Sequence, residues 1–181
     1  PRARRRVAFK VEHGKTTHTT VRSTRDVPIL SDLGDDIADV GAAKNRNVSQ
    51  SNYAVALRWS ALTPRPTIKA VFALDAGQNW NDFRTAAALF TVPSQNLIYA
   101  DVDGNNGYQS PGAIPIRGKG DGRWPVPGWD SAYAWKQQIT FDALPTVYNP
   151  PSGMTVTANN KVIRDQYPLK LGAYNAHAYP S

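Results

Sequence analysis

The chain has 181 residues, of which 41% are hydrophobic, so it is long enough for one domain with a substantial core. It contains no cysteine, which excludes disulfide bridges, thiolate metal sites and a cysteine nucleophile. The net charge is +7, and no apolar run approaches the roughly 20 residues of a membrane-spanning helix. Four arginines lie within residues 1–6, which we interpret as a basic tail, with polyanion binding as the alternative.

A β-hairpin is the first predicted element. Val7, Phe9 and Val11 alternate with other residues at the period of a half-buried strand. The β-branched run over residues 16–24 shows the same alternation after a turn at 13–15. We therefore expect the two runs to pair.

Three segments of different character follow the hairpin. Residues 28–30 are predicted to form a short edge strand. Residues 31–50 are predicted to form a polar surface loop, whose aspartates lack the ligand spacing of a calcium loop. The apolar run over 53–62 predicts a buried strand that ends before Pro64.

A change from alternating to helical spacing predicts a two-helix insertion over residues 67–90. Thr67 and Asn79 are the expected N-caps, and Gly77 is the expected C-cap of the first helix. We expect the apolar side chains at helical spacing to pack in the core rather than to line a ligand pocket. They are Ile68, Val71 and Phe72 in the first helix and Trp80, Phe83, Ala87 and Phe90 in the second.

Strand patterns return after the helices. Turn-forming residues at 103–106 separate two alternating runs and predict a second hairpin. A calcium loop is excluded there, because Asn106 stands at the required glycine and Gly112 at the required glutamate. A last strand is predicted at 154–158. These elements predict an α+β class, mostly β, with antiparallel strands and hairpins and a two-helix insertion, in a single β-rich domain or a fragment of a larger chain.

The residues alone indicate no self-contained active site. The G-x-S-x-G and H-E-x-x-H motifs are absent, and His13, His18 and His177 are scattered along the chain. The sequence GKGDG lacks the lysine and hydroxyl pair of a phosphate-binding loop. A non-catalytic scaffold or polyanion-binding domain is therefore one open hypothesis.

Six short motifs, in one order, carry a resemblance to a known family. They are YADVDGNNGY, PGAIPIR, GDGRWPVPG, YAWKQQITFDALP, YNPPSG and TANNKV. In these motifs the chain resembles the β-chain of the penicillin acylase (penicillin amidase) family of N-terminal nucleophile hydrolases. Two departures indicate a divergent member: Asp26-Val27 replaces the family's His-Gly, and Asn106 stands where the family hairpin usually has isoleucine.

The resemblance implies an enzyme that cleaves linear amides of acylated amines, such as penicillins, cephalosporin derivatives or acyl-homoserine lactones, through an acyl-enzyme. The family's nucleophile is the first residue of the β-chain, usually serine, which its own α-amino group activates. Pro1 has no hydroxyl. We therefore expect an internal fragment of the β-chain that is inactive alone. Its expected partners are the rest of the precursor, namely the α-chain and the N-terminal part of the β-chain, and a small-molecule amide.

The resemblance also implies roles for three residues. Asn159, the first asparagine of TANN, matches the family's oxyanion-hole asparagine, whose amide donates to the developing negative charge. A cap on the preceding turn is the alternative role. Phe72 lies near an acyl-pocket aromatic residue of the family, with a core role as the alternative.

Gly122 falls near a backbone carbonyl that binds a structural calcium in the family. The matching downstream aspartate is missing from residues 171–181, so we do not expect this chain alone to bind calcium. We expect no required cofactor, and a structural calcium is left open only for the complete protein. We expect no membrane and no nucleic-acid partner. The lack of cysteine and the resemblance favour a secreted or periplasmic location.

Overall fold

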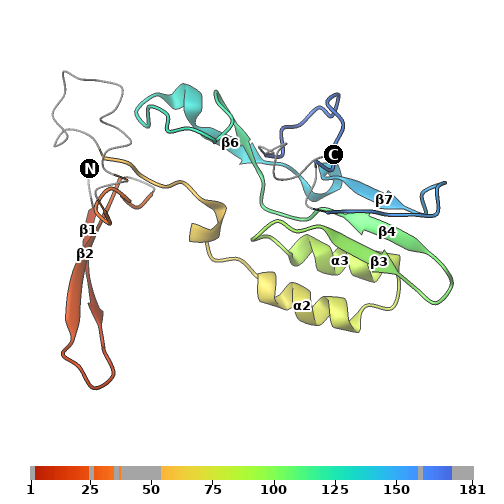
Figure 1. Cartoon of the computed structure of the whole chain (residues 1–181), viewed down its shortest axis with the longest axis horizontal. Coiled ribbons are helices and arrows are strands. Elements are labelled where there is room, and N and C mark those ends of the chain that lie inside the picture. Colours follow the sequence, from red (N-terminus) through yellow and green to blue (C-terminus); the bar gives the residue numbers. More distant parts are fainter. Residues whose placement is uncertain (1–2, 25–26, 35–36, 38–53, 159–160, 173–181) are drawn as a thin grey trace. The chain divides into compact units, whose positions relative to one another are not determined.

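The computed structural model divides the chain into two compact units, residues 1–59 and 60–181 (Figure 1). No helix within the described part of the chain is long and apolar enough to cross a membrane. The described residues are 3–24, 27–34, 37, 54–158 and 161–172.

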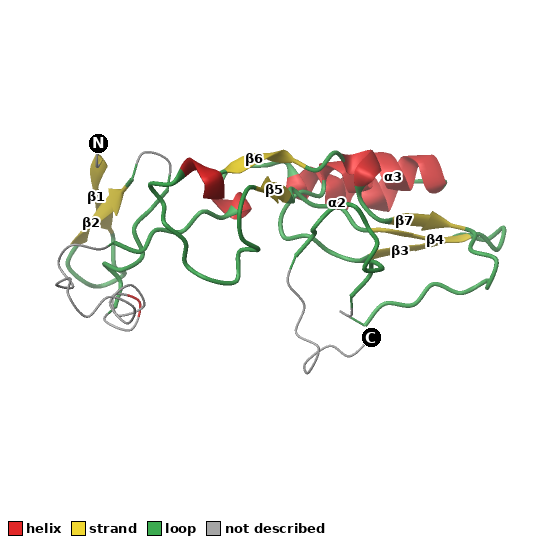
Figure 2. Ribbon diagram, turned by 90° about the horizontal axis from the view of Figure 1, so that it is seen from above, coloured by secondary structure: helices red, strands yellow, loops and turns green. Residues whose placement is uncertain are grey.

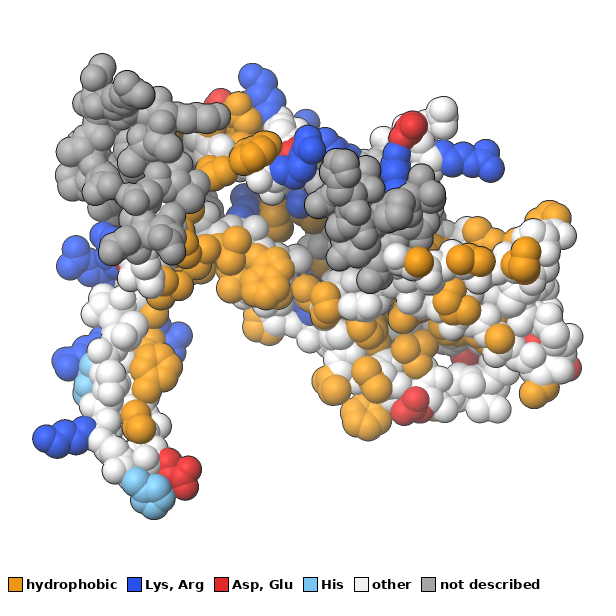
Figure 3. Space-filling view, in the orientation of Figure 1, with side chains coloured by type: hydrophobic (Ala, Val, Ile, Leu, Met, Phe, Trp, Pro, Cys, Tyr) orange, Lys and Arg blue, Asp and Glu red, His pale blue; other side chains and the backbone are white. Residues whose placement is uncertain are grey.

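The first unit contains the predicted hairpin. Strand β1 (Ala3–Phe9) pairs antiparallel with β2 (Thr17–Ser23), and Phe9 lies opposite Thr17. Residues 3–6 belong to β1 rather than to a tail, because their backbone pairs with residues 20–23. The strands are not half-buried as expected: Phe9 is 52% exposed, and Figure 3 shows hydrophobic side chains along one edge of the hairpin.

Between β2 and the end of the first unit, the described residues form only isolated β-bridges. The expected edge strand at 28–30 forms one bridge from Pro28 to Ser23 and one from Ile29 to Ala56. The buried strand expected over 53–62 is not observed among residues 54–62, where Ala56 alone joins a bridge and a 3-10 helix (Ser60–Leu62) follows. The pairing between Ile29 and Ala56 does not extend into a longer ladder, because the segment at 28–30 is short and Pro28 has no backbone N–H to donate. Most of the predicted loop at 31–50 lies outside the described residues.

The second unit contains the two predicted helices, α2 (Thr67–Ala76) and α3 (Trp80–Leu89). The Asn79 side chain caps α3 by accepting hydrogen bonds from the backbone N–H groups of Asn81, at 2.9 Å, and Asp82, at 3.0 Å. Thr67 is the first residue of α2 rather than its cap, since its hydroxyl bonds instead to the hydroxyl of Thr91 at 3.0 Å. Gly77 ends α2 as expected.

The two helices differ in what they bury. Helix α3 buries Phe83, Ala86 and Ala87, in agreement with its predicted apolar stripe. Helix α2 buries only Ala70, while Ile68 is 67% and Phe72 is 70% exposed. The expected core position of the α2 stripe is therefore wrong for the described residues, because no described element packs against that face.

A three-stranded antiparallel sheet, in the order β3-β4-β7, lies under the helices (Figure 2). Strands β3 (Leu97–Ala100) and β4 (Asn106–Gln109) form the second predicted hairpin. Strand β7 (Thr146–Tyr148), which we did not predict, pairs with the other edge of β4. Trp80 of α3 stacks on Tyr148 with ring centroids 4.8 Å apart, which attaches the helix to the sheet.

A second small sheet lies next to a small hydrophobic core cluster. Strands β5 (Pro115–Arg117) and β6 (Trp135–Gln138) pair antiparallel, and two 3-10 helices lie at 131–133 and 141–143. The nearby core cluster consists of Ile114, Ile139 and Leu144, with Leu169 and Leu171 packed against it.

The last predicted strand, at 154–158, is not formed, because none of the described strands pairs with it. The α+β class with small antiparallel sheets is confirmed.

Candidate functional site

Asn159 lies outside the described residues, as does its neighbour Asn160, but the structure describes the chain on both sides of them. The preceding segment leaves β7 through the YNPPSG turn. The following segment begins at Lys161 and returns to the core. We therefore define the candidate site by the hydrogen bonds and packing contacts that hold these two segments in place.

Asparagines connect the turn after β7 to the tip of the β3-β4 hairpin. Asn149 has φ +47°, a left-handed conformation that asparagine tolerates better than most residues. Its backbone N–H donates to the carbonyl of Asn106 at 2.8 Å, and its Oδ1 accepts from the Asn106 backbone N–H at 2.9 Å. Its Nδ2 donates to Oδ1 of Asn105 at 2.7 Å. The turn is thus fixed to the hairpin by three hydrogen bonds.

The side chain of Asn106 holds the chain beyond that turn. Its Nδ2 donates to the carbonyl of Gly153 at 3.2 Å, and its Oδ1 accepts from the hydroxyl of Thr155 at 2.9 Å. Gly153 has φ +68°, and its N–H donates to the carbonyl of Pro150 at 2.8 Å. We call the group formed by Asn105, Asn106, Asn149, Gly153 and Thr155 the asparagine clamp.

The segment between the clamp and Asn159 presents side chains outward. Met154 is 70% and Val156 is 82% exposed. The Thr157 hydroxyl is buried without a hydrogen-bond partner among the residues that the structure describes. Buried hydroxyls usually have a hydrogen-bond partner. The unpartnered hydroxyl and the exposed apolar side chains therefore indicate that the described residues do not supply all the contacts of this segment.

The chain after residue 160 is anchored separately. Lys161 forms an ion pair with Asp165, and this hydrogen bond lowers the pKa of the Asp165 carboxyl. The Tyr167 hydroxyl donates to the carbonyl of Ala143, and burial raises the pKa of that hydroxyl. Leu169 then packs on the core cluster. Both sides of Asn159 are therefore attached to the same unit.

Asp101 organises the tip of the β3-β4 hairpin. Its carboxylate accepts hydrogen bonds from the Tyr99 hydroxyl at 2.8 Å, from the Asp103 N–H at 3.1 Å, and from the backbone and side chain of Asn105. The Asn105 side chain is the main cause that lowers the pKa of Asp101. Burial, followed by the bond to Asp101, raises the pKa of Tyr99 to about 12. These groups hold the turn and do not form an acid-base pair poised near neutral pH.

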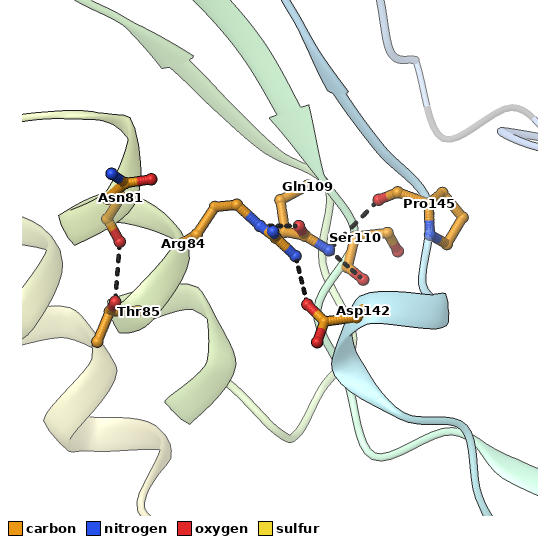
Figure 4. Close-up of polar contacts among 7 residues, drawn as sticks. All are labelled: Asn81, Arg84, Thr85, Gln109, Ser110, Asp142 and Pro145. Atoms are coloured by element: carbon orange, nitrogen blue, oxygen red, sulfur yellow. Dashed lines mark hydrogen bonds and ion pairs between the residues drawn. The ribbon is translucent and has the colours of Figure 1, made fainter.

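A second polar group lies at the other end of β4 (Figure 4). Arg84 of α3 donates through Nε to the fully buried Gln109 at 3.3 Å and through Nη2 to Asp142 at 2.9 Å. The Gln109 Nε2 donates to the carbonyl of Pro145 at 3.4 Å, next to the start of β7. This network joins α3, β4 and the segment before β7, so its role is structural.

The two remaining predicted residues lie apart from the asparagine clamp in the chain. Phe72 is on the exposed face of α2, so the alternative core role is wrong for the described residues. Gly122 lies in an exposed loop with φ +86°. His13 and His18 lie exposed on the β1-β2 hairpin, while His177 is outside the described residues.

The surroundings of Gly122 do not fit a calcium ion. The adjacent Asp121 carboxylate accepts from Arg123 Nε at 2.6 Å and lies 3.7 Å from the Lys170 ammonium. The backbone and side chain of Arg123 lower the pKa of Asp121. A Cβ at Gly122 would lie 2.9 Å from Nε of Arg117. Calcium prefers several carboxylate and carbonyl oxygens, whereas here two cationic groups face the single carboxylate of Asp121 and a third lies beside Gly122. The described residues contain no cluster of three metal-ligating side chains.

Sequence reasoning missed the asparagine clamp and the Arg84 network. The only available signal was the concentration of asparagine and glycine in the two turn motifs, which predicts turns but not a contact between them.

Comparison with known proteins gives a consistent result. Residues 1–180 match the penicillin amidase family. The chain is 32% identical to the penicillin acylase 2 proenzyme of a Pseudomonas species over 93% of this chain and 20% of that protein. It is 29% identical to the acyl-homoserine lactone acylase QuiP of Pseudomonas fluorescens over 92% of this chain and 19% of that protein.

A solved structure, the thermostable penicillin G acylase from Alcaligenes faecalis, resembles the chain with a TM-score of 0.67 and 25% identity. The match covers 96% of this chain and 29% of that one. The chain thus spans about a fifth of the length of the curated relatives that it matches.

Proposed function

The chain belongs to the penicillin amidase family, and from this premise we propose that it is part of an amide hydrolase, to which it contributes the oxyanion-stabilising side of the active site. The family match along residues 1–180 is the observation that carries the proposal. The proposed substrates are linear amides of acylated amines, because the relatives are named as acylases of penicillins and of acyl-homoserine lactones.

The proposed reaction proceeds through an acyl-enzyme. A hydroxyl supplied by polypeptide outside residues 1–181 attacks the amide carbonyl and loses its proton to a base, and the carbonyl oxygen becomes an anion. When the C–N bond breaks, the amine leaves with a proton, and water later releases the acid. In this scheme the Asn159 amide donates a hydrogen bond to the anion. A fixed neutral donor needs no reorganisation as the charge develops.

Hydrogen bonds hold the described chain on either side of Asn159. Thr155 is bonded to Asn106 on one side of Asn159, and Tyr167 is bonded to Ala143 on the other. Phe72 stays a proposed substrate contact, since its ring is exposed, as contact with an acyl group requires. A structural calcium in the complete protein would need carboxylates from other parts of the polypeptide.

Replacement of Asn159 in the full-length enzyme tests the assignment. We expect Asn159→Ala to lower kcat on a chromogenic amide by about 10² or more, because one oxyanion donor is lost. Asn160→Ala, the matched control, removes an identical amide one residue later and should change kcat by no more than a few fold. Equal activity of the Asn159→Ala variant and the parent enzyme would remove the oxyanion assignment.

A further inference from the structure

The register of the β1-β2 hairpin places three arginines on one face. Successive residues of a strand point to opposite faces, and residues paired across two strands share a face. Arg4 pairs with Arg22, and Arg6 pairs with Thr20, so Arg4, Arg6 and Arg22 lie on the same side of the hairpin. We call the side that carries these three residues the arginine face.

The opposite face is mainly apolar. Arg5 lies there because it pairs with Val21, and Phe9 shares this side. Figure 3 shows hydrophobic side chains along one edge of the hairpin and most of its Lys and Arg side chains along the other. A two-stranded hairpin is marginally stable by itself, and exposed apolar side chains usually pack on another part of a protein. When the apolar face makes such a contact, the arginine face points away from it.

The positive charges of the arginine face are only partly compensated. The Arg22 guanidinium forms two hydrogen bonds with the Asp32 carboxylate, one of them at 2.7 Å. Arg4 and Arg6 are exposed, and neither forms an ion pair within the part of the chain that the structure describes. Like charges directly opposite each other on paired strands lower stability, and Arg4 lies opposite Arg22. The hairpin therefore keeps two arginines whose charge no described carboxylate offsets.

We infer that the arginine face binds an acidic polysaccharide, a linear polymer that carries carboxylate or sulfate groups. The planar guanidinium group binds carboxylates and similar oxyanions through two parallel hydrogen bonds. Arg4 and Arg6 are two residues apart on one strand, so their Cα atoms lie about 6.8 Å apart and both side chains can contact one extended polymer. Within β1 and β2, this face carries no Phe, Tyr or Trp side chain on which a nucleobase could stack. The inference is independent of the proposed hydrolase activity.

Binding of dextran sulfate to the full-length protein tests the inference, with uncharged dextran as the control polymer. We expect the double variant Arg4→Gln/Arg6→Gln to bind dextran sulfate about tenfold more weakly or worse at about 50 mM salt. The slope of log affinity against log salt should fall by about 1–2, because two charge contacts are lost. Arg5→Gln is the matched control: it removes the same charge from the same strand but from the opposite face, and the affinity should change less than about twofold.

Three results of the binding experiment would overturn the inference. If Arg5→Gln weakened binding as much as Arg4→Gln or Arg6→Gln, net charge and not the arginine face would govern binding. If the parent protein bound uncharged dextran equally well, or bound neither polymer, the anionic groups would not be recognised. If duplex DNA bound more tightly than dextran sulfate at the same salt concentration, the ligand would be a nucleic acid and not a polysaccharide.

Thermal unfolding without polymer tests for an internal partner instead. We expect Arg4→Gln to leave the thermal midpoint of the full-length protein unchanged or slightly raised, because repulsion by Arg22 is removed. A clear fall of the midpoint in Arg4→Gln but not in Arg5→Gln would mean that a carboxylate elsewhere in the polypeptide already occupies the face, and the inference would be wrong. If the double variant does not fold, Arg6→Gln carries the binding test, and an unchanged affinity of that variant overturns the inference.

Discussion

Asp101 shows how one carboxylate can organise a turn. It accepts hydrogen bonds from the side chain of Asn105, from the backbone N–H groups of Asn105 and Asp103, and from the Tyr99 hydroxyl, which closes the tip of the β3-β4 hairpin. These donors favour the ionised form, so the pKa of Asp101 lies below its ordinary value of 3.8. The same tip carries Asn105 and Asn106, so Asp101 also supports the asparagine clamp.

The lowered pKa of Asp101 gives a prediction for pH dependence. A carboxyl whose folded-state pKa is depressed stabilises the protein above its unfolded-state pKa, and this contribution is lost as pH falls through the folded-state pKa. Asp101→Asn should therefore lower the thermal midpoint of the full-length protein at neutral pH, and its difference from the parent should shrink below about pH 4. Thermal unfolding between pH 7 and pH 3 measures this difference.

Asp103→Asn is the control for this prediction. Asp103 carries the same charge two residues away, but it contributes its backbone N–H rather than its carboxylate to the turn. The control should leave the midpoint nearly unchanged. A difference between Asp101→Asn and the parent that stays constant with pH would contradict the role of the ionised carboxylate.

At the scale of elements, Gly107 allows α3 to approach β4. A Cβ at this position would lie 2.6 Å from Cζ3 of Trp80 and 2.9 Å from the Val147 carbonyl oxygen, and real Cβ atoms do not approach so closely. We expect Gly107→Ala to lower the free energy of unfolding by about 1–3 kcal/mol, because Trp80 must move from its stack on Tyr148. Urea denaturation of the full-length protein measures the loss.

Gly128→Ala is the matched control. No atom of the described residues lies within 4 Å of a Cβ at Gly128, so the substitution should change the free energy by no more than about 0.5 kcal/mol. If both variants were equally stable, the close packing of α3 on β4 would be wrong.

Local signals predicted the elements whose partners lie nearby in the sequence. The alternation around Val7 and the cap at Asn79 are properties of a few adjacent residues, and both the first hairpin and α3 were predicted from them. Strand β7 has only three residues and pairs with β4 almost forty positions earlier, so no local pattern could indicate it. The strands expected at 53–62 and 154–158 did not form for the converse reason. The first meets a partner only at one bridge, between Ala56 and Ile29, and the second pairs with none of the described strands.

The same distinction applies to the candidate site. The oxyanion role of Asn159 was predicted from the resemblance of the TANN motif to the family and not from any property of the neighbouring residues. The clamp joins Asn106 to Gly153 and Thr155, which are far apart in the sequence, and the sequence indicated only that both regions form turns. Long-range side-chain bonds of this kind become visible only when the strands that carry them are paired.

At the scale of the whole molecule, both units leave apolar side chains exposed. Phe9 and Val21 lie on one face of the β1-β2 hairpin at 52% and 39% exposure, and Ile68 on α2 is 67% exposed. Clustered apolar surface of this kind usually marks a contact with another part of a protein. The curated relatives are about five times as long as this chain, so we expect the rest of the polypeptide to cover these faces.

Substitution of adjacent residues on α2 tests this expectation in the full-length protein. If the face is covered, Ile68→Glu should lower the free energy of unfolding by about 2 kcal/mol or more, because it removes apolar burial and places a charge in the contact. Lys69→Glu, a polar position one residue later, should change it by about 0.5 kcal/mol or less. Urea denaturation compares the two. Equal, small effects would mean that Ile68 faces solvent in the complete protein, and the exposed face of α2 would then not be an internal contact.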